Sequence, residues 1–310
     1  MAYIKEWKER IQSVIVGNDE SIELCLIALV ARGHVLLEDF PGTGKTTMAK
    51  TIAKTISGTF SRIQFTSDTL PTDVTGLEIF NQKTSSFQIR TGPIFANVVL
   101  IDEVNRATPR TQSALLEAME EKQVTIAGEE LTLPEPFFVI ATQNPIESVG
   151  TFPLPEAQLD RFLICINNGY PSMEEEQIML NRFKNNEPLQ EVVPYISAET
   201  VREWQMSARD VHIHPDIEQY LLTLIHETRN HPSVKIGASP RASLALLRAC
   251  QARAFLYGRK FITPDDIQVL ATPVLAHRLL LTIEGEMNGT GKDIISQILE
   301  KISVPAEEWL

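Results

Sequence analysis

The amino-acid sequence predicts an α/β fold, in which a parallel sheet with helices on both faces is followed by a small all-helical domain. In the first half of the chain, short apolar strands such as Val98–Ile101 and Phe137–Ala141 alternate with segments of helical periodicity. Uniformly apolar strands of this kind are typical of parallel sheets covered on both faces. After Tyr170 and Pro171 the pattern becomes almost entirely helical. We therefore expect one domain over residues 1–186 and a second over residues 187–310.

The first domain is expected to open with two helices. Ile4, Trp7 and Ile11 share one face of a helix over residues 4–13, and Asp19 could cap the next helix. Strands are predicted at residues 35–38, 63–65, 98–101, 137–141 and 163–166, with helices at residues 45–56 and 111–121 between them. Residues 66–76 read as a polar loop, and residues 77–90 and 123–133 as two hairpins.

The remainder of the chain is predicted to be helical at residues 173–184, 197–206, 215–230, 240–256 and 264–280. Proline-bearing breaks at Pro171, Pro188 and Pro194 mark the expected joint between the domains.

The composition of the chain limits the classes of protein to which it can belong. The 310 residues carry 28 Lys and Arg against 40 Asp and Glu, a net charge of −12, which argues against non-specific nucleic-acid binding. The three cysteines are far apart in apolar surroundings, as expected of buried thiols in a reducing compartment. The charged N-terminus does not resemble a signal peptide, and no apolar stretch reaches the roughly 20 residues needed to span a bilayer. We therefore expect a cytoplasmic protein without a membrane span.

The predicted chemistry centres on residues 34–52, where an apolar strand ends in a turn rich in Gly and Pro and a helical pattern begins at Lys45. This order predicts a phosphate-binding loop made by Pro41, Gly42, Thr43, Gly44, Lys45, Thr46 and Thr47. Glycines let consecutive backbone N–H groups converge on phosphate oxygens, and the helix N-terminus adds its positive end. Lys45 would reach the β- and γ-phosphates, and the Thr46 hydroxyl would ligate Mg²⁺. Asp39 stands where the strict motif has Gly, at the opening of the turn.

The tetrapeptide Gly-Thr-Gly-Lys occurs a second time, at Gly289–Lys292. Asp293 follows it, and a carboxylate cannot replace the threonine hydroxyl and would repel phosphate. We therefore expect the second copy to be a surface loop.

Asp102 and Glu103 follow the apolar strand 98–101 and are the expected second half of a nucleotide site. Asp102 can hold Mg²⁺ through its water shell, because Mg²⁺ prefers octahedral oxygen ligation and keeps several waters. Glu103 can orient and activate the water that attacks the γ-phosphate.

Three further residues are candidates for a role in ATP hydrolysis. Asn144 ends the next strand, where a neutral amide can hold the attacking water without adding negative charge; an ordinary turn before Pro145 is the alternative. Arg161 precedes the last strand, and Arg241 opens a helix of the second domain. A surface or ion-paired role is the alternative for each arginine.

ATP is the expected nucleotide, because the sequence lacks an Asn/Thr-Lys-x-Asp stretch that reads guanine. A nucleic-acid motor or loader on the same architecture is the alternative function. The net charge and the lack of a basic, aromatic-interleaved stretch speak against it. A nucleotide sensor without turnover is disfavoured by Glu103.

Long segments of the chain resemble the MoxR ATPases of the AAA+ superfamily. The resemblance is carried by residues 34–47, 62–76, 92–107, 111–120, 141–145, 152–162 and 237–247. Five of these segments are longer than ten residues, and the resemblance extends over essentially the whole chain.

The resemblance implies a role for each matching position. It makes Lys45 and Thr46 the Walker A pair, Asp102 and Glu103 the Walker B pair, and Asn144 the first sensor. Arg161 would be an arginine finger supplied to a neighbouring subunit, and Arg241 a second sensor reaching from the lid to the γ-phosphate. Val16 and Gly17 would back the adenine.

It further implies that the hairpins at 77–90 and 123–133 line the pore face of a ring, which is a hexamer in typical members. It also implies chaperone-like work on a protein client together with a von Willebrand factor A domain protein.

Overall fold

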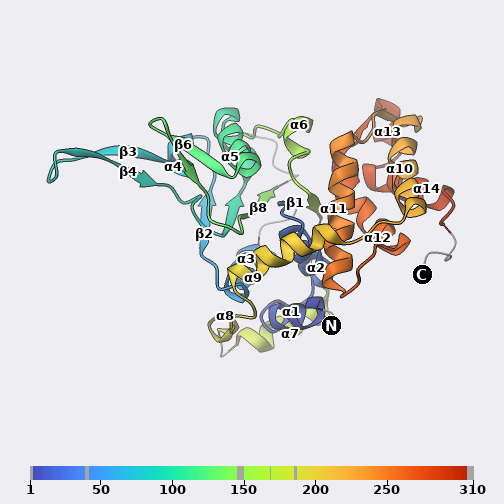
Figure 1. The fold of residues 1–310 in the computed structure, drawn as a ribbon, viewed down its shortest axis with the longest axis horizontal. Coiled ribbons are helices and arrows are strands. Elements are labelled where there is room, and N and C mark those ends of the chain that lie inside the picture. Colours follow the sequence, from blue (N-terminus) through green and yellow to red (C-terminus); the bar gives the residue numbers. More distant parts are fainter. Residues whose placement is uncertain (1–2, 39–41, 145–149, 168, 185–186, 306–310) are drawn as a thin grey trace.

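A five-stranded parallel sheet forms the centre of the protein, with a helical domain beside it (Figure 1). The computed structural model describes residues 3–38, 42–144, 150–167, 169–184 and 187–305. The strand order is β2-β5-β8-β1-β9. The strands are β1 (Val35–Glu38), β2 (Phe60–Gln64), β5 (Val98–Asp102), β8 (Phe138–Gln143) and β9 (Ile164–Ile166). The predicted fold class is confirmed.

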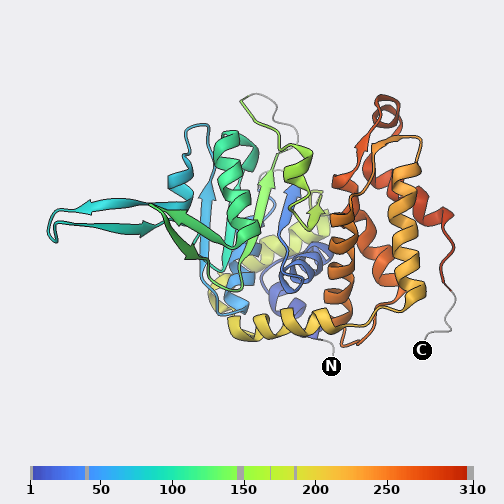
Figure 2. The same ribbon diagram turned by 45° about the horizontal axis from the view of Figure 1, so that its top comes forward.

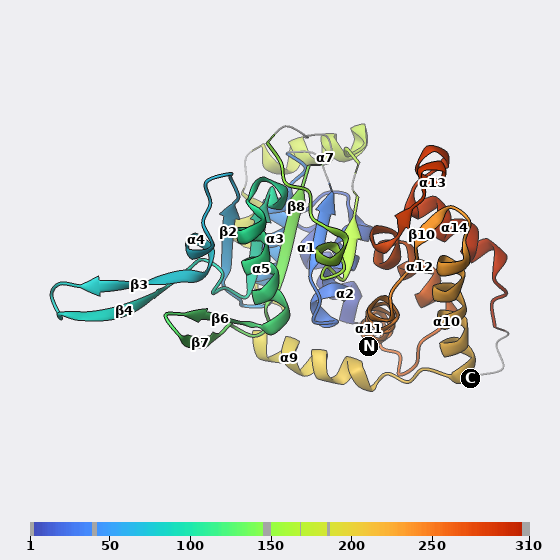
Figure 3. The same ribbon diagram turned by 90° about the horizontal axis from the view of Figure 1, so that it is seen from above.

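Both faces of the sheet are covered, because side chains alternate along each strand. Val35 and Leu37 of β1 point into the hydrophobic cluster that includes the first helices, whereas Leu36 points into the cluster on the other face. Figure 3 shows helices on the two sides of the strands. The helices of this domain are α1 (Tyr3–Gln12), α2 (Asp19–Val30), α3 (Lys45–Thr55), α4 (Pro71–Thr75), α5 (Pro109–Glu121) and α6 (Glu156–Leu159), with the 3₁₀ turn η1 (Val104–Arg106).

Two antiparallel hairpins project from the α/β domain, as predicted (Figure 2). One consists of β3 (Gly76–Asn81) and β4 (Ser86–Thr91), and the other of β6 (Gln123–Ile126) and β7 (Glu129–Thr132). Phe80 pairs with Phe87 across the longer hairpin, and both rings are exposed.

Three helices and the loops between them connect the α/β domain to the helical domain, and some residues of this connection bond to the α/β domain. They are α7 (Met173–Phe183), α8 (Pro188–Glu191) and α9 (Ala198–Ser207), followed by η2 (Ala208–Asp210). The Gln205 side chain donates to the backbone oxygen of Leu29 at 2.8 Å, and Tyr195 N donates to that of Thr55 at 2.7 Å. Residues 185–186, where we expected the domain boundary, lie outside the described residues, so that boundary stays a prediction.

The helical domain packs long helices around apolar faces. Its helices are α10 (Pro215–Asn230), α11 (Pro240–Leu256), α12 (Pro264–Leu275), α13 (Ile283–Asn288) and α14 (Gly291–Lys301), with the 3₁₀ turn η3 (Ala276–Arg278). Two short strands, β10 (Val234–Ile236) and β11 (Leu280–Leu281), pair within it, a detail that the sequence pattern did not predict. Among the described residues, no helix is both long and apolar enough to cross a membrane.

Three local predictions were wrong. Asn18, not Asp19, precedes the second helix, and Asp19 is its first residue. The loop expected at residues 66–76 contains α4, which starts with Pro71. Leu70 N donates to the Asp73 carboxylate at 2.9 Å and so caps the N-terminus of this helix. The second Gly-Thr-Gly-Lys copy is no simple loop either, because its Gly291 and Lys292 open α14.

Candidate functional site

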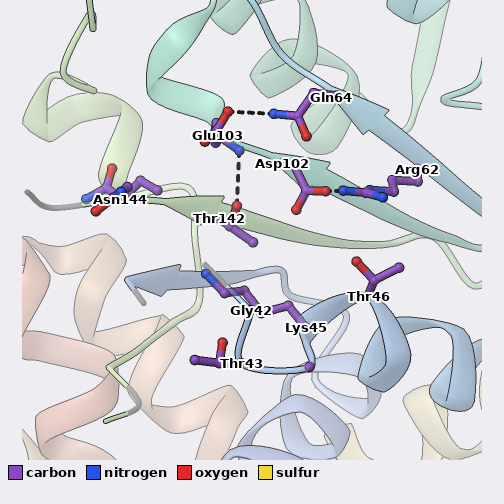
Figure 4. Close-up of a pocket in the computed structure, with 12 residues that line it drawn as sticks. Gly42, Thr43, Lys45, Thr46, Arg62, Gln64, Asp102, Glu103, Thr142 and Asn144 are labelled. Carbon is purple, nitrogen blue, oxygen red and sulfur yellow. Dashed lines mark hydrogen bonds and ion pairs between the residues drawn. The ribbon is translucent and has the colours of Figure 1, made fainter. Parts of the chain in front are cut away.

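A pocket of about 230 Å³ lies at the carboxyl ends of β1, β5 and β8 (Figure 4). The carboxyl ends of parallel strands meet at one sheet edge, where α/β proteins commonly bind ligands. The pocket is lined by Gly42, Thr43, Gly44, Lys45, Thr46, Arg62, Gln64, Asp102, Glu103, Thr142, Gln143 and Asn144. Segments far apart in sequence therefore contribute to one site.

The loop before α3 forms one wall of this pocket. Gly42 and Gly44 have φ angles of 89° and 86°, in the left-handed region that favours glycine, and a Cβ on either would meet no atom within 4 Å. Gly44 stands at the N-cap of α3, where it has no side chain to occupy the free N–H groups of the first turn. The loop thus leaves room and backbone donors for an anion beside Lys45 and Thr46.

The opposite wall carries the two acids. Asp102 ends β5, and Glu103 follows with a φ of 58°, an uncommon conformation for a non-glycine residue. Glu103 N donates to the Thr142 hydroxyl of β8 at 3.0 Å, which helps to hold this turn. Strained backbone of this kind concentrates at functional sites.

Two polar residues of β2 bind these acids, and sequence reasoning did not single them out. Arg62 Nε donates to Asp102 Oδ2 at 2.5 Å, and Gln64 Nε2 donates to Glu103 Oε2 at 2.6 Å (Figure 4). The available signal was the alternation along β2, where Ile63 is buried while Arg62 and Gln64 are exposed. The register that sets Gln64 opposite Asp102 is a tertiary feature.

Asn144 lines the pocket just beyond β8. Its neighbour Gln143 donates to the Glu38 carboxylate at the end of β1, at 2.7 Å, which ties the two strand ends together. The structure therefore brings Asn144 to the same pocket as Lys45 and Glu103.

Arg161 and Arg241 lie elsewhere, since neither lines this pocket in the described part of the chain. Both contact one carboxylate of α5, because Arg161 Nε lies 3.0 Å from Glu120 Oε2 and Arg241 Nη2 lies 2.9 Å from Glu120 Oε1. Arg241 also lies 3.9 Å from Asp160. The core arginine and the lid arginine thus share one surface of the subunit.

The remaining residues that we expected at the nucleotide site do not line the described pocket. Val16 and Gly17 precede α2 and do not line the pocket as described, and a Cβ on Gly17 would clash with the Glu175 side chain of α7. Thr47 lies one residue beyond the lining, in the first turn of α3. Pro41, like Asp39, lies outside the described residues.

The donor set fits a nucleotide phosphate chain with Mg²⁺. Uncovered N–H groups, open space beside two glycines and the Lys45 ammonium suit phosphate oxygens. Hydroxyl and carboxylate oxygens, such as those of Thr46 and Asp102, are the ligand type that Mg²⁺ prefers. A carboxylate next to this set can activate water.

Comparisons with known proteins agree with this geometry. Residues 34–164 match the family model described as ATPase family associated with various cellular activities (AAA), and residues 226–298 match the AAA lid domain.

Relatives extend the match to nearly the whole chain. Chaperone MoxR1 of Mycobacterium tuberculosis is 40% identical over 95% of this chain and 80% of its own, and protein MoxR of Paracoccus denitrificans is 30% identical over 98% of both. The crystal structure of a Cytophaga hutchinsonii protein described as an ATPase superposes with a TM-score of 0.92, at 40% identity over 98% of this chain and 95% of that one. The chain therefore belongs to the MoxR family of AAA+ ATPases and is an ATP hydrolase.

Proposed function

We propose that this ATPase works as a ring of identical subunits that uses ATP hydrolysis to remodel or mature a protein partner. The observation that carries the proposal is that one pocket contains both the loop of Gly42–Thr46 and, facing it, Asp102 and Glu103 (Figure 4). The relative named Chaperone MoxR1 supports work on a protein client.

The glycine loop and Lys45 would hold the phosphates of ATP, with Pro41, Thr43 and Thr47 completing the loop. Lys45 supplies the one cation that this loop directs at the β- and γ-phosphates. Val16 and Gly17 would back the adenine, and the helical lid of residues 187–310 would close over the nucleotide. Mg²⁺ held by Thr46 and Asp102 would neutralise charge that develops on the transferred phosphate.

Glu103 would take a proton from the attacking water, while the Asn144 amide positions that water. Gln64 donates to the Glu103 carboxylate, so it competes with water for the same oxygen. Arg62 donates to one oxygen of the Asp102 carboxylate, the residue that would hold Mg²⁺ through its water shell.

Arg161 would complete the site of the neighbouring subunit by stabilising negative charge at its γ-phosphate. Among the described residues Arg161 does not line the pocket of its own subunit, which supports this assignment. Arg241 would act as a second sensor that reaches from the lid to the γ-phosphate; in the structure it shares Glu120 with Arg161. Hydrolysis would then depend on assembly.

The ring is proposed to be a hexamer, with the projecting hairpins β3–β4 and β6–β7 on its pore face and a von Willebrand factor A domain protein as partner. We place it in the cytoplasm, where its three buried, unpaired cysteines would stay reduced.

Mixing two inactive variants tests the shared site. Arg161→Ala keeps its loop and Lys45→Ala keeps its arginine, so an Arg161→Ala subunit beside a Lys45→Ala subunit has one complete site. Each variant alone should lose about 10³-fold in turnover or more, and phosphate release should reappear on mixing. A mixture that stays inactive although the two variants co-assemble would contradict the proposal.

A further inference from the structure

Arg62 and Lys45 are the two cations that line the described part of the phosphate pocket. Lys45 follows the glycine loop at the start of α3, whereas Arg62 lies in the middle of β2, beside the strand that ends in Asp102. The Arg62 side chain is 52% exposed although it pairs with Asp102. A guanidinium that lines a pocket and stays half exposed is accessible to a ligand in that pocket.

Most of the hydrogen-bonding capacity of Arg62 is unused. Its Nε donates to Asp102 Oδ2 at 2.5 Å, and its two terminal nitrogens donate to no residue that the structure describes. A guanidinium carries five N–H donors in a planar fork, so it can bind a carboxylate and a second anion together. Figure 4 shows the side chain extended from β2 to Asp102. Arg62 can thus hold Asp102 and a phosphate oxygen at once.

The charge balance of the pocket also favours a contact between Arg62 and phosphate. The described lining residues place Lys45 and Arg62 against the carboxylates of Asp102 and Glu103, so their charges cancel. Without Arg62, one cation would face two carboxylates, and the lining would repel a polyphosphate. Because an arginine side chain is always charged, it supplies this positive charge whether or not Mg²⁺ is bound.

The neighbours of Arg62 indicate which end of the phosphate chain it would contact. Asp102 is the residue proposed to hold Mg²⁺, which bridges the β- and γ-phosphates in sites of this class. Gln64 lies on the same face of β2 as Arg62, because side chains alternate along a strand. Gln64 binds Glu103, the residue proposed to activate the water that attacks the γ-phosphate. Arg62 therefore lies beside the place expected for the terminal phosphate.

We propose that Arg62 binds the terminal phosphate of ATP within its own subunit and thereby makes the pocket favour ATP over ADP. The proposal rests on the proposed function, because it takes the phosphates to lie between the glycine loop and the two acids. Hydrogen bonds from a guanidinium to phosphate are charge-assisted and about twice as strong as neutral ones. ADP has no γ-phosphate, so it would lack this bond.

Nucleotide binding without Mg²⁺ tests the proposal, because it separates a phosphate contact from an effect that passes through Asp102 and the metal. Arg62→Gln removes the charge and keeps an amide that can donate to Asp102. In excess EDTA, this variant should bind a fluorescent ATP analogue about tenfold or more weakly than the wild-type chain. Its affinity for the matching ADP analogue should change by less than about threefold, because ADP lacks the phosphate that Arg62 binds.

Two further variants complete the comparison. Arg110→Gln makes the same substitution at an exposed position of α5 outside the described pocket lining, and it should bind both nucleotides like the wild-type chain. Arg62→Lys keeps the charge but not the planar fork, so its loss of ATP affinity should lie between those of the wild-type chain and Arg62→Gln. The lysine variant carries the test if Arg62→Gln proves unstable in a thermal melt.

Unchanged ATP binding by Arg62→Gln would overturn the proposal. Equal losses for ATP and ADP, or an ATP loss that occurs only with Mg²⁺, would also overturn it and leave Arg62 as a residue that positions Asp102. Normal nucleotide binding by Lys45→Ala would instead overturn the location of the phosphates, and with it the proposed function of this pocket.

Discussion

The two copies of Gly-Thr-Gly-Lys have the same four residues and different structures. In the first copy, α3 begins at Lys45, and the glycines before it have open space beside their Cα atoms. In the second, α14 begins at Gly291, and a Cβ there would lie 2.5 Å from the backbone oxygen of Ala276. The glycines of the first copy leave room for a ligand, whereas Gly291 permits close packing of the chain.

The residue after the lysine completes the difference. Thr46 leaves the N-terminus of α3 open, but the Asp293 carboxylate accepts from both Thr290 N and Thr290 Oγ1 at 2.7 Å. These bonds lower the pKa of Asp293, so it stays ionised at the helix end that an anion would need. A helix N-terminus that its own carboxylate caps is no phosphate site.

Exchanging the residue that follows the lysine should produce the largest change in nucleotide binding. Thr46→Asp puts a carboxylate at the mouth of the first loop and should reduce Mg·ATP binding by more than about 100-fold, since it repels phosphate and removes the hydroxyl. Thr46→Ser keeps the hydroxyl and should bind nearly normally. The reverse change, Asp293→Thr, should create no second nucleotide site in equilibrium dialysis. Detection of one would show that the tetrapeptide alone suffices.

Replacing an acid by its amide should slow ATP turnover in the nucleotide pocket but not at the second Gly-Thr-Gly-Lys copy. Glu103→Gln should bind ATP yet hydrolyse it about 10²–10⁴-fold more slowly, because the amide cannot accept the proton. Asp293→Asn makes the same change in the second copy and should leave turnover unaltered. Steady-state phosphate release measures both, and normal release by Glu103→Gln would exclude it as the water-activating residue.

Carboxylates of the lid should affect stability instead of chemistry. Asp266 is fully buried and binds Arg253 and Arg259. Burial alone would raise the pKa of Asp266, but hydrogen bonds and charge from Arg259, Thr263 and Arg253 hold it below its ordinary value. Asp266→Ala should cost about 3 kcal/mol or more in urea denaturation, because it removes the buried carboxylate that Arg253 and Arg259 share.

The matched control is Asp265→Ala, whose side chain is 68% exposed and lies 2.9 Å from Arg253; it should cost at most about 1 kcal/mol. Because the folded-state pKa of Asp266 is depressed, its contribution is present above its unfolded-state pKa of about 3.9 and is lost as the pH falls through the folded value. Equal losses in the two variants would contradict this assignment.

Local sequence patterns predicted most of the fold, because buried strands such as Val35–Leu37 are apolar throughout and need no knowledge of their partners. The helix α4 was missed because Pro71 and Asp73 resemble turn residues, although proline at a first helical position and an acid two residues later also open helices. The helix α14 was missed because its buried residues, Ile294 and Ile295, come only after Asp293.

The site was predictable where one segment supplies the residues and less so where distant segments meet. Lys45 and Thr46 open the helix that follows β1, and Asp102 and Glu103 stand at the end of β5; parallel strands bring these ends together. The contact of Gln64 with Glu103 depends on strand register, and that of Arg241 with Glu120 depends on how the lid docks. No local spacing encodes either one.

The most direct measurement compares the two lysines. Lys45→Ala and Lys292→Ala remove the same ammonium group from the same tetrapeptide, and titration with a fluorescent ATP analogue and Mg²⁺ measures binding to each. Lys45→Ala should show no saturable binding, and Lys292→Ala should match wild type, because Lys45 lines the pocket proposed for the phosphates and Lys292 is not among its described lining residues. Normal binding by Lys45→Ala, or its loss in Lys292→Ala, would contradict the assignment of the nucleotide site.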